Sequence, residues 1–555
     1  MNKNFSSWWN TGAPWIWLNA AAVTASLTMV AGLLYLIAVN GLGHFWAKTV
    51  WQIEYREPDG QVQRLIGEIV DKEKISGERL QNNNQQVQDE EAEFVERYLL
   101  KTGNRDVSGL DFRWILQPSI LGRSKPENLV VLERLEWGNF FGFVVNVSEN
   151  GEQVAEGEAA WQELQARLER VDEIRARIRR LEKAEIGSIN YNIERLRLER
   201  RRLELEDRDT PEALADIEQQ REALQAEFSG LQKGLDARYA EISRDSVIMT
   251  VMDGRTVTVP LSNIVRAYQP NAMGMLGKIG FYIAKLWEFI SADPREANTE
   301  GGIFPAIFGT VMMVILMSVM VTPFGVVAAV YLREYAKQGP LTRLIRIAVN
   351  NLAGVPSIVY GVFGLGFFVY FLGGNLDQLF YPEALPSPTF GTPGLMWASL
   401  TLALLTLPVV IVATEEGLAR IPSSVREGSL ALGATKAETL WRTVLPMSTP
   451  AMMTGLILAV ARAAGEVAPL MLVGVVKLAP ALPLDGNSPF LHLDRKFMHL
   501  GFHFFDVGFQ SPNVEAARPL VYATALLLVV IIVALNLTAI AIRNRLRERY
   551  RELEQ

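Results

Sequence analysis

Cysteine is absent from this chain of 555 residues, and histidine occurs only 4 times. The absence of cysteine excludes disulfides, zinc–thiolate sites and thiol nucleophiles. An excess of positive charge is also absent, because the formal net charge is -7. Nucleic acid is therefore not expected as the main partner, since binding to its phosphate backbone requires a basic surface.

A phosphate-binding loop of the form GxxxxGK[ST] is missing as well. The most similar string, GATK at residues 433–436, lacks the first glycine and the required spacing. We therefore expect this chain not to hydrolyse ATP, and we predict no catalytic residue, no metal site and no bound cofactor in it.

Apolar residues are abundant, at 49% of the chain, and they are gathered into long runs between strongly charged stretches. A helix needs about 20 apolar residues to cross the hydrocarbon core of a bilayer. The first run is longer than the apolar core of a secretory signal, so we expect it to be a retained anchor. We predict membrane helices at residues 15–42, 304–331, 348–372, 397–414, 450–473 and 519–542.

Lysine and arginine are unevenly distributed over the loops between these runs. They are frequent after the second, fourth and sixth runs, whereas residues 373–394 contain none. Short cytoplasmic loops carry the positive excess, so we expect both termini in the cytoplasm and the long insert on the external side, the bacterial periplasm. The predicted organisation is a cytoplasmic tail at 1–14, a first membrane helix at 15–42, a periplasmic insert at 43–299, a five-helix core at 300–543 and a cytoplasmic tail at 544–555.

The insert begins and ends with strand-like sequence. Each of these stretches contains a central Asp-Gly pair, at residues 59–60 and 253–254. Such pairs are typical of tight hairpin turns, which need positive φ. A third β-rich stretch at residues 129–147 completes the prediction of a small β-rich domain.

Residues 158–242 have a helical pattern, with apolar side chains every three or four residues among glutamate and arginine. This is the spacing of a coiled-coil seam. The sequence RDTP at 208–211 interrupts the pattern, which predicts an antiparallel helical hairpin whose second helix starts at Pro211. The hairpin is interpreted as a solvated helix pair with a structural seam, and a specific docking arm is the alternative.

The segment EEGLARIPSSVREGSLALGATKAETLWRTVLP, at residues 415–446, is the most specific motif in the chain. It predicts a helix starting after Pro422, a close turn at Gly433 and a second helix ending at Pro446. Two short helices on a cytoplasmic face can act as a lever inserted into a groove of a partner. An ordinary interfacial loop with an amphipathic helix is the alternative interpretation.

This segment resembles the coupling loop of permeases from ATP-binding-cassette importers, in which a Glu-Ala-Ala-like triplet precedes a glycine and a final Leu-Pro. The matching residues are Glu427, Gly428, Ser429, Gly433, Leu445 and Pro446. Gly428 and Ser429 replace the usual alanines and Thr443 replaces the usual isoleucine, while the small size and the spacing are kept. The resemblance implies that Glu427 and its neighbours contact a separate ATPase subunit and that Gly433 permits the bend.

The fifth apolar run contains two charged residues, Arg462 and Glu466. Their spacing of four places them on one face of a helix. Ionisable groups inside a bilayer normally face a bundle interior or a water-filled path. Arginine has a fork of donors suited to tetrahedral oxyanions, so we predict an anion translocation path here. A purely structural ion pair is the alternative.

A second resemblance concerns the segments ARAAGEVAP, at 461–469, and NNLAGVPSIVYGVFGLGFFV, at 350–369. Both are similar to segments of PstA-type phosphate permeases, and the likeness extends over residues 301–543. Its structural signature includes Gly354, Pro356, Ser357, Tyr360 and Gly361. We expect the proline to interrupt its helix and the glycines to permit close helix packing. The long insert replaces the short link that is usual in this family.

These resemblances imply an α-helical integral membrane protein, with six membrane helices and an external β-rich domain bearing an antiparallel coiled-coil hairpin. They further imply the permease subunit of an ATP-driven importer of inorganic phosphate in the bacterial inner membrane. The implied partners are two ATPase subunits, a second homologous permease and a periplasmic phosphate-binding protein. The alternatives are import of another oxyanion, such as molybdate, and a membrane-anchored coiled-coil scaffold or phosphate-signalling component.

Overall fold

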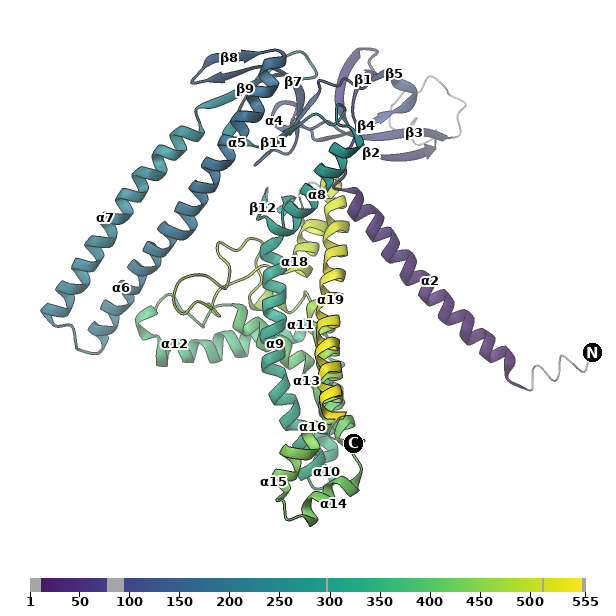
Figure 1. Ribbon diagram of the computed structural model, residues 1–555, viewed down its shortest axis with the longest axis vertical. Coiled ribbons are helices and arrows are strands. Elements are labelled where there is room, and N and C mark those ends of the chain that lie inside the picture. Colours follow the sequence, from purple (N-terminus) through teal and green to yellow (C-terminus); the bar gives the residue numbers. More distant parts are fainter. Residues whose placement is uncertain (1–10, 77–93, 296–297, 512–513, 552–555) are drawn as a thin grey trace, which may run out of the picture.

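A computed structural model describes residues 11–76, 94–295, 298–511 and 514–551. Two β-sheets lie at one end of the molecule, and a bundle of long helices extends away from them (Figure 1). A pair of long helices leaves the sheets sideways, and helix α2 (Ala13–Gly43) diverges from the bundle. The predicted terminal tails lie partly outside the described residues, because these exclude 1–10 and 552–555.

The first sheet has 5 strands in the order β4-β3-β2-β1-β5, all pairing antiparallel. In the β1–β2 turn, Gly60 has a φ of 87°, a conformation that glycine adopts without strain. The hairpin predicted from Asp59 and Gly60 is confirmed. The elements of this sheet are β1 (Val50–Arg56), β2 (Val62–Ser76), β3 (Phe94–Lys101), α4 (Arg105–Ser108), β4 (Phe112–Leu116), η1 (Gln117–Ser119) and β5 (Ile120–Ser124).

The second sheet follows the order β10-β9-β7-β6-β11, with β8 pairing to β7. Gly254, in the β9–β10 turn, has a φ of 81°, so the second predicted hairpin is also confirmed. The β-rich stretch predicted at 129–147 forms the antiparallel pair β6 and β7. The elements are β6 (Val130–Arg134), β7 (Phe140–Glu149), β8 (Glu152–Glu156), β9 (Asp245–Thr250), β10 (Thr256–Pro260), η3 (Leu261–Asn263) and β11 (Ile264–Tyr268).

The two long helices leave the second sheet after β8 and return to it at β9. The outgoing arm consists of α5 (Glu158–Arg180), the π-helical turn η2 (Leu181–Ile186) and α6 (Gly187–Leu205), and α7 (Pro211–Ile242) returns beside it (Figure 1). Pro211 is the first residue of α7, as predicted, and the Thr210 side chain caps the helix by accepting from Ala213 N at 3.3 Å. The coiled-coil seam itself stays a prediction.

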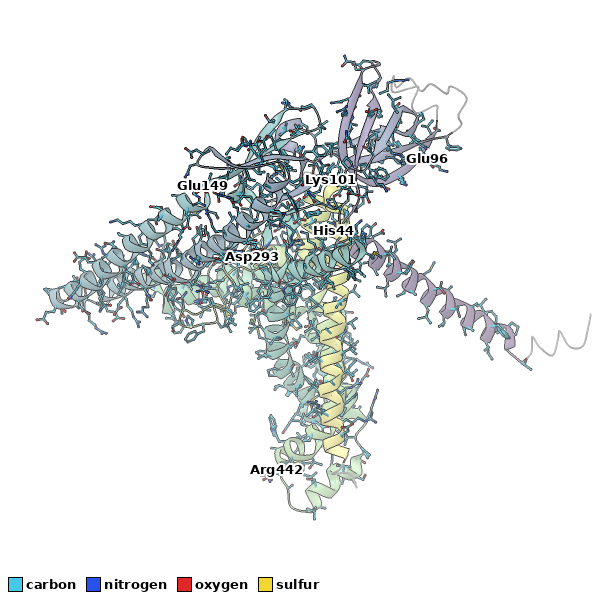
Figure 2. The ribbon with its side chains drawn as sticks, turned by 45° about the horizontal axis from the view of Figure 1, so that its top comes forward. His44, Glu96, Lys101, Glu149, Asp293 and Arg442 are labelled. Carbon is cyan, nitrogen blue, oxygen red and sulfur yellow. The ribbon has the colours of Figure 1, made fainter. Side chains whose placement is uncertain are left out.

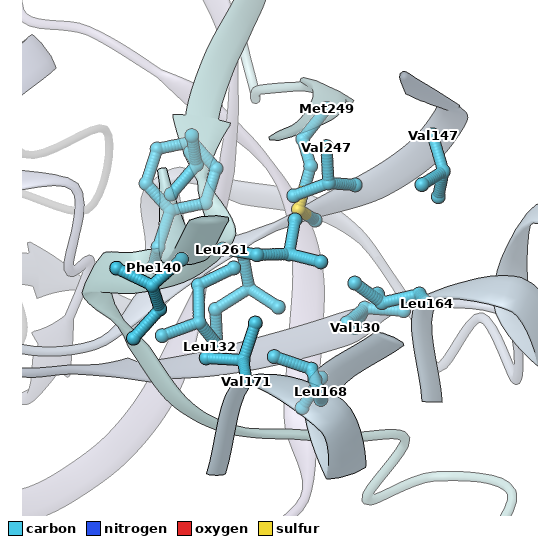
Figure 3. Close-up of a cluster of buried hydrophobic side chains, with 14 of the residues drawn as sticks. Val130, Leu132, Phe140, Val147, Leu164, Leu168, Val171, Val247, Met249 and Leu261 are labelled. Carbon is cyan, nitrogen blue, oxygen red and sulfur yellow. The ribbon is translucent and has the colours of Figure 1, made fainter. Parts of the chain in front are cut away.

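The root of this arm is part of the core of the second sheet. Leu164, Leu168 and Val171 of α5 are buried in one cluster with Val130 and Leu132 of β6 (Figure 3). Full burial of each such side chain contributes about 1.5–3 kcal/mol to folding. The outgoing helix therefore covers the sheet before it extends into solvent.

A buried carboxylate fixes the point at which the arm rejoins the sheet. Asp245 begins β9 and is 1% exposed. Its oxygens lie 2.6 Å from Arg167 Nη1, 3.0 Å from Arg170 Nη2 and 3.1 Å from Arg244 Nε. Three guanidinium groups thus compensate a charge that would be costly to bury alone.

The chain then enters the helix bundle through α8 and a short β-ribbon. Within the bundle, α13 is central, since 67% of its most apolar window is buried against neighbouring helices. The elements are α8 (Met275–Ser291), β12 (Pro294–Arg295), β13 (Glu300–Gly301), α9 (Phe304–Val330), η5 (Tyr331–Tyr335), α10 (Pro340–Leu352), α11 (Ser357–Phe363), η6 (Gly364–Gly373), α12 (Gly374–Phe380), η7 (Pro382–Ala384), α13 (Leu395–Ala419), α14 (Ser423–Ala431), α15 (Lys436–Thr439), η8 (Leu440–Val444), α16 (Leu445–Ala464), α17 (Leu470–Val473), α18 (Leu500–Phe505), η9 (Asp506–Gln510) and α19 (Val514–Arg551).

Among the described residues, 6 helices are long and apolar enough to cross a membrane. This number agrees with the prediction. They are Pro14–Gly43, Phe304–Tyr335, Ser357–Phe380, Leu395–Ala419, Lys436–Ala464 and Ala517–Glu548.

Two of the six predicted membrane spans, the third and the fifth, have wrong boundaries. The third span, predicted at 348–372, runs from Ser357 to Phe380, because Pro356 disfavours helical geometry in the residue before it and separates α10 from α11. The fifth span, predicted at 450–473, runs from Lys436 to Ala464. The length of an uncharged run predicts that a helix can span the membrane, but it does not predict the residue at which that helix begins or ends.

The helix predicted to end at Pro446 does not end there. It continues from α15 through η8 into α16. Pro446 has no N–H to donate, and the π-helical turn at 440–444 directly before α16 absorbs the local irregularity. The segment predicted as a loop at 415–446 thus also includes the end of α13 and the start of α16.

Candidate functional site

The segment between the fourth and fifth membrane helices folds into two short helices at the end of the bundle opposite the sheets (Figure 1). Ser429 Oγ of α14 lies 2.9 Å from Thr439 Oγ1 of α15, so a hydroxyl pair joins the two helices. A buried cluster joins η8, which continues α15, to the end of α13, and Val425 of α14 packs against it; its buried members are Leu418, Ile421, Leu440 and Val444. The motif is a packed unit, and we call it the coupling segment (residues 423–444).

Gly433 forms the bend between the two helices. Its φ is 91°, and nothing lies within 4 Å of the Cβ that another residue would add there. Glycine is therefore needed for its backbone conformation and not for space. Thr435 then begins α15 with a capping box, in which Thr435 Oγ1 accepts from Glu438 N at 3.3 Å and the Glu438 carboxylate accepts from Thr435 N at 2.9 Å.

The outer face of the coupling segment is available for contact. Glu427 and Gly428 are exposed. Leu432 and Trp441 are 92% and 72% exposed, which is unusual for large apolar side chains. Neither residue is distinguished by the sequence, because an apolar residue in a helical pattern is expected in the core until its burial is known.

Ion pairs tie this segment to the helices around it. Arg426 Nη2 lies 2.9 Å from Glu334 Oε1, and its guanidinium also donates to the carbonyls of Leu418 and Ile421 at 2.8 and 2.7 Å. The sequence analysis did not find this pair, because the two residues are 92 positions apart. It rigidly connects α14 to the end of the second membrane helix.

Leu445 and Pro446 lie within the continuous helix that runs from Lys436 to Ala464. The same helix contains Arg462 in its last turn. The coupling segment and the predicted anion path are therefore joined by one element.

Arg462 and Glu466 lie close together, but only Arg462 belongs to the helix. Arg462 Nε lies 3.6 Å from Glu466 Oε1, and the two side chains are 34% and 19% exposed. The helix ends at Ala464, so Glu466 belongs to the non-helical segment that follows, and the prediction of one shared helix face is wrong. A carboxylate on a separate segment can move relative to the guanidinium.

The residues of the third-span signature occupy the start of α11. Gly354 and Pro356 lie in the break between α10 and α11, and Ser357 is the first residue of α11. Tyr360 donates from its hydroxyl to Leu352 O at 2.6 Å, which ties α11 back to α10 across the break.

This signature contacts the segment that follows Arg462. A Cβ on Gly361 would lie 2.7 Å from Pro469 Cα, so only glycine permits this approach. The two segments singled out by resemblance are thus adjacent in space.

Residues 321–552 match the family described as "Binding-protein-dependent transport system inner membrane component". The phosphate transport system permease protein PstA of Mycobacterium leprae (strain TN) is 34% identical over 269 residues, or 48% of this chain and 79% of that protein. PstA 1 of Mycobacterium tuberculosis (strain CDC 1551 / Oshkosh) is 34% identical over 44% of this chain and 71% of its own length. A probable PstA of Methanocaldococcus jannaschii is 29% identical over 43% of this chain and 74% of that protein.

The fold and these matches define a multi-pass permease, the membrane-spanning subunit of a transport system. More narrowly, the chain belongs to the family of PstA phosphate transport system permease proteins. The residues that match the family model, 321–552, do not include the insert between the first two membrane helices.

Proposed function

We propose that this chain is the permease subunit of an ATP-driven importer that moves inorganic phosphate across a bacterial inner membrane. The observation that carries the proposal is the contact between α11 and residues 465–469 beside Arg462. These are the segments that resemble phosphate permeases, and they meet beside a partly exposed guanidinium in a membrane helix. The relatives are phosphate transport system permeases, which favours phosphate over another oxyanion.

The proposed orientation places the coupling segment in the cytoplasm and residues 43–299 in the periplasm. Two observations support it. The loops after the second and fourth membrane helices are rich in lysine and arginine. The sheets and the coupling segment also lie at opposite ends of the bundle (Figure 1). The proposed domain division is the predicted one, with a five-helix core at 300–543.

In the proposed mechanism, a pair of ATPase subunits binds the coupling segment through Glu427, Gly428 and the exposed Leu432 and Trp441. Movement of this segment is transmitted along the helix from Lys436 to Arg462, about 40 Å at 1.5 Å per residue. The helix then displaces Arg462 relative to Glu466. When the Arg462 guanidinium is released from the Glu466 carboxylate, it can bind the anion. When the two groups pair again, the anion is expelled.

The remaining partners are proposed from the transport class. A second homologous permease completes the path, and a periplasmic phosphate-binding protein delivers the solute to the external face. The helical arm at 158–242 is proposed to be an antiparallel coiled coil on that face.

Replacement of Arg462 tests the proposal. In proteoliposomes containing the assembled complex, Arg462→Met is expected to lower uptake of labelled phosphate at least about tenfold, since a charge-assisted hydrogen bond is lost. Arg255→Met, at an exposed turn of the β-domain, is the matched control and should retain uptake. Unchanged uptake in the Arg462 variant would refute the proposed path, and uptake inhibited by molybdate but not by phosphate would refute the proposed solute.

A further inference from the structure

A cavity of about 280 Å³ lies at the junction between the insert and the membrane helices. Its walls come from the first sheet, the second sheet, α8, the residues that follow α2 and the start of α19. Figure 2 shows Lys101 and His44 at this junction, where the sheets meet the helices. No residue of the proposed translocation path lines it.

Four polar side chains from four separate elements line this cavity without a protein partner. They are Lys48, Glu68, Lys101 and Tyr268. Glu68 and Tyr268 are only 9% and 8% exposed. Within the described part of the chain, none of the four makes a hydrogen bond or an ion pair within 4.0 Å. Glu68 and Tyr268 are buried and the two lysines are partly buried, so the cavity wall presents four polar groups that a ligand can engage.

Strand pairing explains why two of these groups point into the same space. Glu68 of β2 and Lys101 of β3 are direct partners in the antiparallel ladder. Residues directly opposite each other have their side chains on the same face of a sheet. The geometry would allow an ion pair, yet the carboxylate and the ammonium remain separate at the cavity wall.

Two ion pairs join other charges around the cavity, whereas Asp111 Oδ1 is buried there without a hydrogen-bond partner. Glu133 Oε2 lies 2.6 Å from Lys285 Nζ, and Glu288 Oε1 lies 2.9 Å from Arg295 Nη2. Burial, together with nearby lysines, lowers the pKa of His44 to about 3, so its ring is neutral at pH 7. The cations left for a ligand are therefore the two lysines, Lys48 and Lys101.

The charged state of Lys101 and the raised pKa of Glu68 are compatible with binding of an oxyanion that carries a proton. Burial opposes the charged form of Lys101, but Glu300, Asp111, Glu68 and other carboxylates outweigh it and raise the pKa of the ammonium, which stays charged. Burial is the main cause that raises the pKa of Glu68. The carboxyl of Glu68 can accept a hydrogen bond from a phosphate hydroxyl when it is ionised and donate one when it is protonated.

We propose that this junction cavity binds a phosphate group. Lys48 and Lys101 supply two charged donors, the Tyr268 hydroxyl supplies a third donor, and Glu68 pairs with a hydroxyl or oxygen of the ligand. The group belongs either to inorganic phosphate or to a lipid headgroup, since Phe45, which follows membrane helix α2, and Leu520 of membrane helix α19 also line the cavity. The site is separate from Arg462, so this proposal does not depend on the translocation path.

Binding measurements on the full-length chain in its assembled complex, purified without a binding protein, test the proposal. In phosphatidylcholine nanodiscs, equilibrium retention of labelled inorganic phosphate is compared between the unmodified complex, Lys101→Met and Tyr268→Phe. Lys233→Met, an exposed lysine of α7, is the matched control. Arg462→Met separates this cavity from the translocation path. A parallel preparation from native membranes is analysed for retained phospholipid by mass spectrometry.

Three results together support binding of free phosphate. Retention of inorganic phosphate persists in Arg462→Met, falls at least about tenfold in Lys101→Met, and falls by a smaller factor in Tyr268→Phe. A phospholipid retained by the unmodified complex and by Lys233→Met, but lost from Lys101→Met, supports binding of a headgroup. Equal retention of both ligands in the cavity variants and in the control, or retention of neither, overturns the proposal. Tyr268→Phe keeps the ring and its packing, so it remains informative if Lys101→Met fails to fold.

Discussion

At the scale of single residues, a comparison of Gly433 with Gly428 distinguishes a glycine required for its backbone conformation from one that is not. Neither would place an added Cβ within 4 Å of another atom. Gly433 has a φ of 91°, whereas Gly428 lies inside α14. Any difference between alanine variants at the two positions therefore reports backbone conformation alone.

Gly433→Ala is expected to destabilise the coupling segment by about 1–2 kcal/mol, because an L-residue is strained in the left-handed region. Gly428→Ala is expected to stabilise α14 by up to about 1 kcal/mol, since alanine favours helix. Hydrogen exchange of residues 423–444 measures both, with faster exchange in the first variant only. Equal exchange in the two variants would mean that the bend does not depend on Gly433.

The contacts of Arg426 could not be predicted from the coupling-loop motif. The resemblance selected its neighbour Glu427, which is exposed. The structure shows that Arg426, partly buried against Glu334, carries the contacts that hold α14 in place. Arg426 therefore holds α14 in place, and Glu427 beside it stays exposed.

At the scale of elements, the contact between α11 and residues 465–469 depends on a helix face without side chains. A Cβ at Gly361 would lie 2.7 Å from the Pro469 backbone, which cannot rotate away as a side chain can. Gly366, in the π-helical continuation η6, has nothing within 4 Å of its added Cβ. The two glycines form a matched pair on consecutive turns.

Gly361→Ala is expected to cost about 1–3 kcal/mol by overpacking and to shift α11 away from the Arg462 segment. Gly366→Ala should leave both stability and transport near their original values. The Tm of the purified complex and its phosphate uptake measure the two effects. A Tm of Gly361→Ala equal to that of Gly366→Ala would show that the contact is looser than described.

At the scale of the whole molecule, the helical arm has two distinct parts. Its root carries buried α5 residues that belong to the core of the second sheet. The arm also contacts the segment between α17 and α18, since the Tyr191 hydroxyl donates to Ser488 O and the Tyr191 ring lies 6.0 Å from that of His492. Beyond this contact, charged and mostly exposed side chains continue to the turn at 206–210.

These two parts predict opposite outcomes for two deletions. Removing residues 158–242 strips buried α5 side chains from the sheet, and the β-domain is expected to unfold or to resist expression. Removing the equal stretches 198–204 and 211–217 keeps the root, the Tyr191 contact and the turn, so folding and phosphate uptake should persist. Thermal unfolding and uptake of both variants provide the measurement. Loss of uptake in a well-folded shortened variant would favour a docking arm over a solvated helix pair.

The sequence alone determined the number of membrane helices, both hairpin turns, the helical arm whose second helix starts at Pro211, and the family. These features depend on local signals, namely apolar length, Asp-Gly turns, helical periodicity and a contiguous motif. Tertiary structure decided where the third and fifth spans begin and end, that Glu466 lies beyond its helix, that Arg426 pairs with Glu334, and that Lys48, Glu68, Lys101 and Tyr268 meet at one cavity. The Arg426–Glu334 pair and the cavity join groups distant in the chain, and only packing brings those groups within reach.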